Sequence, residues 1–95
     1  MNPTLPPLHR AALDATTAEA LFDDLAALTT IEVVRIKGAV GACTLAEARD
    51  ALDAGARGVQ VRYRWGGETW LDTILRTPAG LRIVRTHPSD TELQP

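Results

Sequence analysis

A single hairpin constrains this sequence more than any other feature. Residues 59–65 (VQVRYRW) and 68–75 (ETWLDTIL) alternate apolar and polar side chains on either side of Gly66 and Gly67. Two glycines between alternating runs are typical of a two-residue turn, and such a turn fixes the register of its strands. The expected pairs are Trp65 with Glu68, Tyr63 with Trp70, Val61 with Asp72, and Val59 with Ile74.

This register sorts the hairpin into two faces, because side chains alternate along a strand. Val59, Val61, Tyr63, Trp70 and Ile74 share one face, which we expect to lie under the helices. We interpret Tyr63 and Trp70 as core anchors, since burying a large aromatic side chain stabilises a fold strongly. Trp65 is beside the turn and is expected to be half exposed. The arginines and threonines of the hairpin fall on the opposite face, so aromatic and cationic side chains are segregated.

Asp72 is an acid on the apolar face of the hairpin. If residues 77–80 (TPAG) form a plain turn, Arg85 of the last strand lies opposite Asp72, and such a pair contributes about 0.2–1 kcal/mol. A bulge at Gly80 would break this pairing. The functional alternative is a carboxylate used in acid–base catalysis, but the sequence offers it no partner acid, base or metal.

The remaining segments predict an α+β fold in one domain of residues 14–87. A helix is expected over 16–29, capped by Thr16 and Glu19, and a second over 44–55, with a Thr44–Glu47 capping box and Gly55 as its stop. With strands at 31–37 and 81–86, the element order is α-β-α-β-β-β. It describes one mainly antiparallel sheet, ending in a three-stranded meander, with two helices on one face. The strand at 31–37 can pair with the first strand of the hairpin or with the last strand.

The ends and the composition limit the class of protein. Residues 1–13 contain three prolines and read as a flexible arm, and residues 88–95 read as a flexible tail. The chain has 95 residues, a net charge of −2 and one cysteine, so no internal disulfide is possible. Neither a signal peptide nor a membrane span is visible. We expect a cytoplasmic protein, bacterial in its use of alanine and arginine.

One loop could carry chemistry. Residues 37–44 connect a strand to a helix through glycines, loosely like an anion site, and a thiol at a helix N-terminus has a lowered pKa. The candidate residues are Lys37, Gly38, Gly41, Cys43 and Thr44. The loop lacks the ending of a phosphate-binding loop, and the plain alternative is a half-buried structural cysteine. His9, His87 and one cysteine give no metal-ligand spacing, so we expect no metal, no cofactor and no catalytic site.

The second face of the sheet is the candidate binding surface. With Val34, Ile36 and Glu32 turned inward, Ile31, Val33 and Arg35 join the outer face, which becomes basic and partly apolar at once. The candidate interface residues are Arg35, Lys37, Arg62, Arg64, Leu71, Leu75 and Arg82. We expect a small non-enzymatic protein that binds an acidic protein or a second copy of itself through this face. One alternative is nucleic-acid binding through the same arginines. The other is that the arm or a helix of the same chain covers this face and the arginines are simply solvated.

Overall fold

The central hairpin organises the sheet as the glycine pair predicts. The computed structural model describes residues 10–87, in which β3 (Gly58–Trp65) pairs antiparallel with β4 (Glu68–Thr77). Gly66 and Gly67 have φ of 63° and 80°, and a turn that needs positive φ at both positions is the one that suits a two-residue hairpin. All the expected cross-strand pairs, from Trp65–Glu68 to Val59–Ile74, are confirmed.

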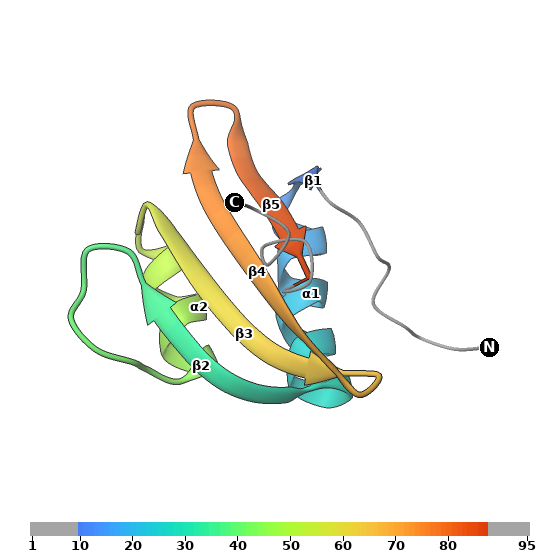
Figure 1. Cartoon of the computed structure of the whole chain (residues 1–95). Coiled ribbons are helices and arrows are strands. Elements are labelled where there is room, and N and C mark those ends of the chain that lie inside the picture. The colour runs from blue at the N-terminus through green and yellow to red at the C-terminus, as the bar shows by residue number, and fades with distance from the viewer. Residues whose placement is uncertain (1–9, 88–95) are drawn as a thin grey trace, which may run out of the picture.

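The other strands extend this hairpin to a five-stranded antiparallel sheet in the order β1-β5-β4-β3-β2. β5 (Gly80–Thr86) follows β4 through a tight turn, and β2 (Thr30–Ile36) pairs with β3. The open question about the strand at 31–37 is therefore answered in favour of the first strand of the hairpin. Figure 1 shows both helices behind the sheet, with its other face turned toward the viewer.

An additional strand, β1 (Arg10–Leu13), begins the described chain, so the element order is β-α-β-α-β-β-β. Residues 10–13 belong to the segment expected as a flexible arm, and for them that expectation is wrong. They pair with β5 across Leu13–Leu81 and Arg10–Val84, and Ala11 and Leu13 pack against the core. The rest of the expected arm, residues 1–9, and the expected tail, residues 88–95, lie outside the described residues.

The two helices cover one face of the sheet. α1 (Ala15–Leu28) is capped by Asp14, whose carboxylate accepts the Thr17 amide at 2.7 Å, so the predicted cap at Thr16 is wrong. α2 (Leu45–Asp53) begins with the predicted capping box, in which Thr44 and Glu47 exchange hydrogen bonds of 2.9 and 3.0 Å. The buried apolar residues of the helices and sheet are Ala18, Leu21, Phe22, Leu25, Ala48, Leu52, Val34, Val59, Val61, Tyr63, Ile74 and Ile83.

A bulge in β2 changes the expected faces of that strand. The register of β2 shifts between Ile31 and Val33, so Ile31 lies opposite Tyr63 and packs against the core. Glu32 is correspondingly exposed and meets the guanidinium of Arg62 at 3.7 Å. The predictions that Ile31 faces outward and Glu32 inward are therefore wrong, because strict alternation fails where one strand carries an extra residue.

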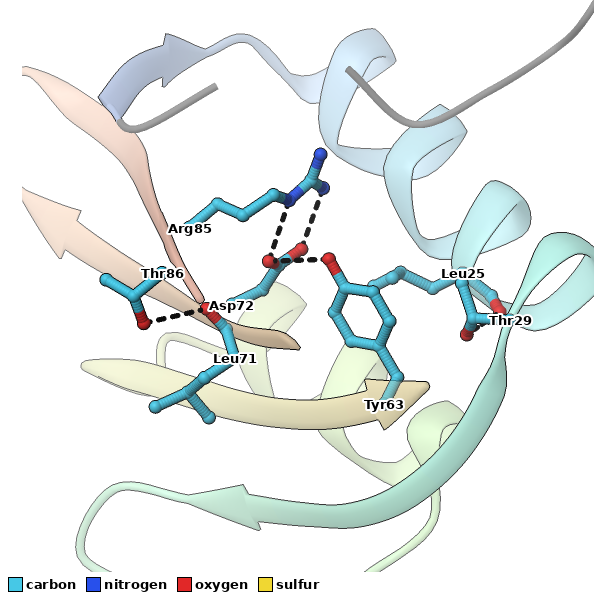
Figure 2. A network of polar contacts seen from close by, with 7 residues as sticks. All are labelled: Leu25, Thr29, Tyr63, Leu71, Asp72, Arg85 and Thr86. Carbon is cyan, nitrogen blue, oxygen red and sulfur yellow. Dashed lines mark hydrogen bonds and ion pairs between the residues drawn. The ribbon is translucent and has the colours of Figure 1, made fainter. Parts of the chain in front are cut away.

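Three polar side chains are buried together beneath α1. Arg85 on β5 donates two hydrogen bonds of 2.8 Å to the carboxylate of Asp72 on β4, and Tyr63 on β3 donates a third of 2.9 Å. Figure 2 shows the three side chains meeting at the carboxylate. Asp72 is 0% exposed and Arg85 3%, so this pair is far more deeply buried than a cross-strand surface pair. The predicted pairing of Asp72 with Arg85 is confirmed.

The tryptophans close one end of this buried layer. Trp65 and Trp70 meet edge to face, with ring centroids 6.1 Å apart, and Trp70 meets the ring of His87 at 4.7 Å. Trp70 is only partly buried, so it closes the margin of the core, while Tyr63 anchors its centre. His87 also lies 2.7 Å from a carboxylate oxygen of Glu68.

Removing one partner of the buried pair is expected to destabilise the fold strongly. Arg85→Met leaves the Asp72 carboxylate without its cation, which costs about 3–5 kcal/mol of unfolding free energy. Converting all three residues, in Tyr63→Phe/Asp72→Leu/Arg85→Met, is expected to recover most of that loss. Denaturant unfolding measures both variants, and a cost below about 1 kcal/mol for Arg85→Met would contradict this account.

Alkaline pH is expected to unfold the chain through Tyr63. Burial raises the pKa of the Tyr63 phenol well above its ordinary value of 10.0, and the Asp72 charge adds to the effect while Arg85 opposes it. Stability is therefore intact below the unfolded pKa, near 10.0, and is lost as the pH rises above it. Tyr63 is the single tyrosine of the sequence, so tyrosinate absorbance reports it alone. If the Tyr63 phenol instead titrates near pH 10 before any change in circular dichroism, this prediction is contradicted.

Candidate interaction surface

The face of the sheet turned away from the helices, here called the open face, brings the predicted interface residues together. Arg35, Arg62, Arg64, Leu71, Leu75 and Arg82 all project from it, and Lys37 follows directly at the end of β2. Its arginines are exposed, and its leucines are half buried. The full set of open-face residues is Arg10, Ala12, Thr30, Val33, Arg35, Gln60, Arg62, Arg64, Thr69, Leu71, Thr73, Leu75, Thr77, Arg82, Val84 and Thr86.

Charge is segregated between the two sides of the molecule. Among the described residues, the acid beside the open face is Glu32, whose contact with Arg62 is long and solvent-exposed and so contributes little. The helical layer is opposite in sign: Arg49 is the cation of its helices and already bonds Asp23 at 2.9 Å, while Arg76 of β4 reaches the end of α2 and donates to the carbonyls of Leu52 and Ala56. The acids of that layer and its caps are Asp14, Glu19, Asp23, Asp24, Glu47, Asp50 and Asp53.

Two hollows lie side by side on the open face. The first, of about 320 Å³, is lined by Leu75, Gly58, Thr73, Lys37 and others at the end of β2, and we call it the Leu75 hollow. The second, of about 200 Å³, is lined by Val33, Arg62 and Leu71, and we call it the Leu71 hollow. Arg35 and Gln60, which stand opposite each other in the sheet, line both hollows and form the ridge between them.

Gly58 makes the Leu75 hollow possible. A Cβ at this position would lie 3.0 Å from the Ile74 carbonyl oxygen and 3.0 Å from a methyl of Leu75. The backbone of Gly58 has no positive φ, so the glycine is needed for this close approach and not for its conformation. Any larger residue would press on Leu75 and on the backbone of β4.

The aromatic side chains are absent from the open face. The sequence has two tryptophans, one tyrosine and one phenylalanine. Tyr63, Trp65 and Trp70 share the helix-covered side of the sheet, and Phe22 is buried on α1. A face without aromatic rings gives single-stranded bases nothing to stack on, so the arginines alone remain for nucleic acid.

The glycine loop uses, within the fold, several of the donors on which the predicted anion and thiol site would depend. The Cys43 amide donates to the Val34 carbonyl at 2.9 Å, and the Thr44 and Glu47 amides are used by the capping box. Gly38 and Gly41 have the positive φ of tight turns, and the Lys37 side chain belongs to the Leu75 hollow. Burial and the charge of Glu47 raise the pKa of the Cys43 thiol, which is opposite to the lowered pKa expected at a helix N-terminus.

Three residues that matter for the open face are not among the predicted interface residues. Arg10 lies in the segment expected as an arm, so its place on β1 depends on a strand that the pattern does not predict. Gly58 could have been found, because a glycine at the start of a strand often marks close packing. Gln60 carries no signal of its own, since only its partner Arg35 makes it part of a ridge.

Two other kinds of feature are absent from the part of the chain that the structure describes. Residues 10–87 contain no group of three or more histidine, cysteine or acidic side chains placed to hold a metal ion. None of the helices within that range has the length and apolarity needed to span a bilayer. Comparison with protein-family models, with curated proteins and with solved structures finds no match to this sequence.

Cys43 is expected to react slowly with thiol reagents. Because the raised pKa reduces the thiolate fraction, the native chain should react more slowly at neutral pH than the denatured chain does. A disulfide reagent that releases a chromophore measures both rates. Faster reaction of the native chain would show an activated thiol and restore the site that the sequence suggested.

Proposed function

We propose that this chain is a small non-enzymatic binding protein whose open face binds an acidic partner protein. The observation that carries the proposal is the segregation of charge: exposed arginines surround two partly apolar hollows on one side of the sheet. Apolar surface rimmed by charge is typical of interaction sites, and the weakly hydrated guanidinium binds carboxylates well. The proposed setting is the bacterial cytoplasm.

Self-association through two open faces is a poorer explanation. A symmetric dimer places the same surface on both sides, so Arg35, Arg62 and Arg82 of one copy would meet the same cations of the other. Like charges across an interface oppose binding and cost several kcal/mol when they are desolvated. The basic character of the face therefore favours a partner of different sequence.

Docking of the acidic helices of one copy onto the open face of the next is also disfavoured. Such a head-to-tail contact closes only when the rotation between copies completes a ring, and otherwise it continues into an open filament. The apolar residues Leu21, Phe22 and Leu25 of α1 are buried under it, so its outer side offers mainly carboxylates and alanines. The half-buried Leu28 is its one larger aliphatic side chain that is not buried, and two are needed to fill the two hollows.

Nucleic acid is the second candidate, and the exposed arginines are the observation in its favour. The absence of aromatic rings from the face removes base stacking, and the chain as a whole carries a net charge of −2. Binding would then rest on phosphate contacts alone, with steep dependence on salt and no preference for sequence.

Reversing one charge on the open face is expected to weaken the binding of the partner protein strongly. Arg62→Glu is compared with Arg57→Glu, which makes the same change at an exposed arginine that lines neither hollow. Both substitutions are at the surface, so each should alter stability by less than about 0.5 kcal/mol. Proteins captured from the host by cross-linking would be identified, purified and titrated by calorimetry at low and moderate salt.

The expected result is an acidic protein whose affinity falls by about tenfold or more with Arg62→Glu, falls with added salt, and is unchanged by Arg57→Glu. A captured protein that binds both variants equally would contradict the proposal. Retention of nucleic acid alone, lost with Arg62→Glu, would replace it with the second candidate.

A further inference from the structure

We infer that the open face takes an acidic amphipathic helix of the partner, with two aliphatic side chains seven or eight residues apart in the two hollows and a carboxylate between them on Arg35. The inference rests on the proposed function and goes beyond it, because it states what kind of segment the partner presents. It follows from the spacing of the hollows, the charge on the ridge between them, and the absence of free backbone groups on this face.

The spacing of the hollows sets the length of the segment. Leu71 lines one hollow and Leu75 lines the other, and both project from the same strand, β4, four positions apart. At about 3.3 Å per residue these two positions are about 13 Å apart. A helix rises about 1.5 Å per residue, so positions seven or eight apart on one helix face are about 10.5–12 Å apart, close to that separation.

The ridge between the hollows supplies the charge recognition. A helix that seats aliphatic groups in both hollows turns the residue one turn after the first toward the ridge, where Arg35 is exposed beside Gln60. A glutamate or aspartate at that position meets a guanidinium that can donate two parallel hydrogen bonds. Lys37 and Arg62, at the outer walls of the two hollows, extend the same preference for acids along the segment.

Backbone hydrogen bonding favours a helix over an extended segment. β3 and β4 lie inside the sheet with a paired strand on each side, so the open face presents side chains and no free backbone groups. The outer edge of β2 is covered at its Val34–Ile36 end by the following loop, in which the amides of Ala39 and Cys43 donate to the carbonyls of Ile36 and Val34 at 3.0 and 2.9 Å. A helix bonds its own backbone and loses nothing by lying on such a surface, whereas a flat extended segment would bury unpaired groups.

The loop after β2 extends the apolar part of the site. Ala39 lines the Leu75 hollow, and the next residue, Val40, is fully exposed, the one large hydrophobic residue among those described that is wholly open to solvent. Gly38 and Gly41 flank it with positive φ and hold it in a turn. A helix lying across the hollow therefore has an additional aliphatic contact at this end.

Two synthetic peptides of equal composition test the spacing. Both are glutamate- and alanine-based helix formers with two leucines and a midway glutamate; in one the leucines are eight residues apart, and in the other they lie on opposite sides of the helix. We expect the first to bind the full chain at least about tenfold more tightly and to gain helical circular dichroism on binding. Equal affinity of the two peptides, or binding without a gain in helix, would overturn the inference.

Two variants of the chain test the ridge. Arg35→Gln is expected to weaken the binding of the peptide whose leucines are eight residues apart by about fivefold to tenfold. Arg82→Gln, on the same face but outside both hollows, should change the affinity for that peptide by less than about twofold. Equal effects of both would mean that the peptide senses only the general charge of the face and would overturn the inference. A natural partner still lost with Arg62→Glu but indifferent to Arg35→Gln would leave the proposed function standing while this inference fails.

Discussion

The buried carboxylate of Asp72 is the constraint on which the sheet depends. An ionised group in the core is stable only when its charge and its hydrogen bonds are satisfied, and here Arg85 and Tyr63 satisfy them from the two neighbouring strands. A slip of one residue in β4 would turn Asp72 to the open face and leave Arg85 buried alone. The network therefore selects one register of β3, β4 and β5, which is its clearest contribution to the fold.

That register also decides where the remaining charges lie. With Asp72 and Arg85 neutralising each other under α1, strand alternation directs Arg62, Arg64 and Arg82 to the opposite face. The helices carry mainly acids, so a chain with a net charge of −2 presents a basic face on one side and an acidic layer on the other. Net charge is therefore a poor guide to partners here, because a partner meets the local field of one face.

The sequence predicts those parts of this fold that depend on near neighbours. Gly66 and Gly67 determine the hairpin register, and Thr44 with Glu47 marks the start of α2, because a turn or a cap is complete within a few residues. Strand β1 could not be predicted in this way, since RAAL has no β-branched residue and becomes a strand by pairing with β5. The bulge at Glu32 and the hollow over Gly58 likewise depend on residues distant in the chain. The residues of the open face could therefore be predicted from the sequence, but the hollows and bulges that shape its surface could not.

Within residues 10–87, the open face is the surface on which binding costs least structural rearrangement. The apolar stripes of α1 and α2 are buried in the core, and the Val34–Ile36 end of the outer edge of β2 is covered by the following loop. β1 is four residues long and offers little backbone to a new strand. What remains is a sheet whose strands are fixed in register by the network at Asp72, so the positions from which its outer side chains project are fixed as well. Preformed surfaces of this kind need little ordering on binding. In the proposed function, the side chains of Arg35, Leu71 and Leu75 would therefore discriminate between partners by spacing as well as by charge.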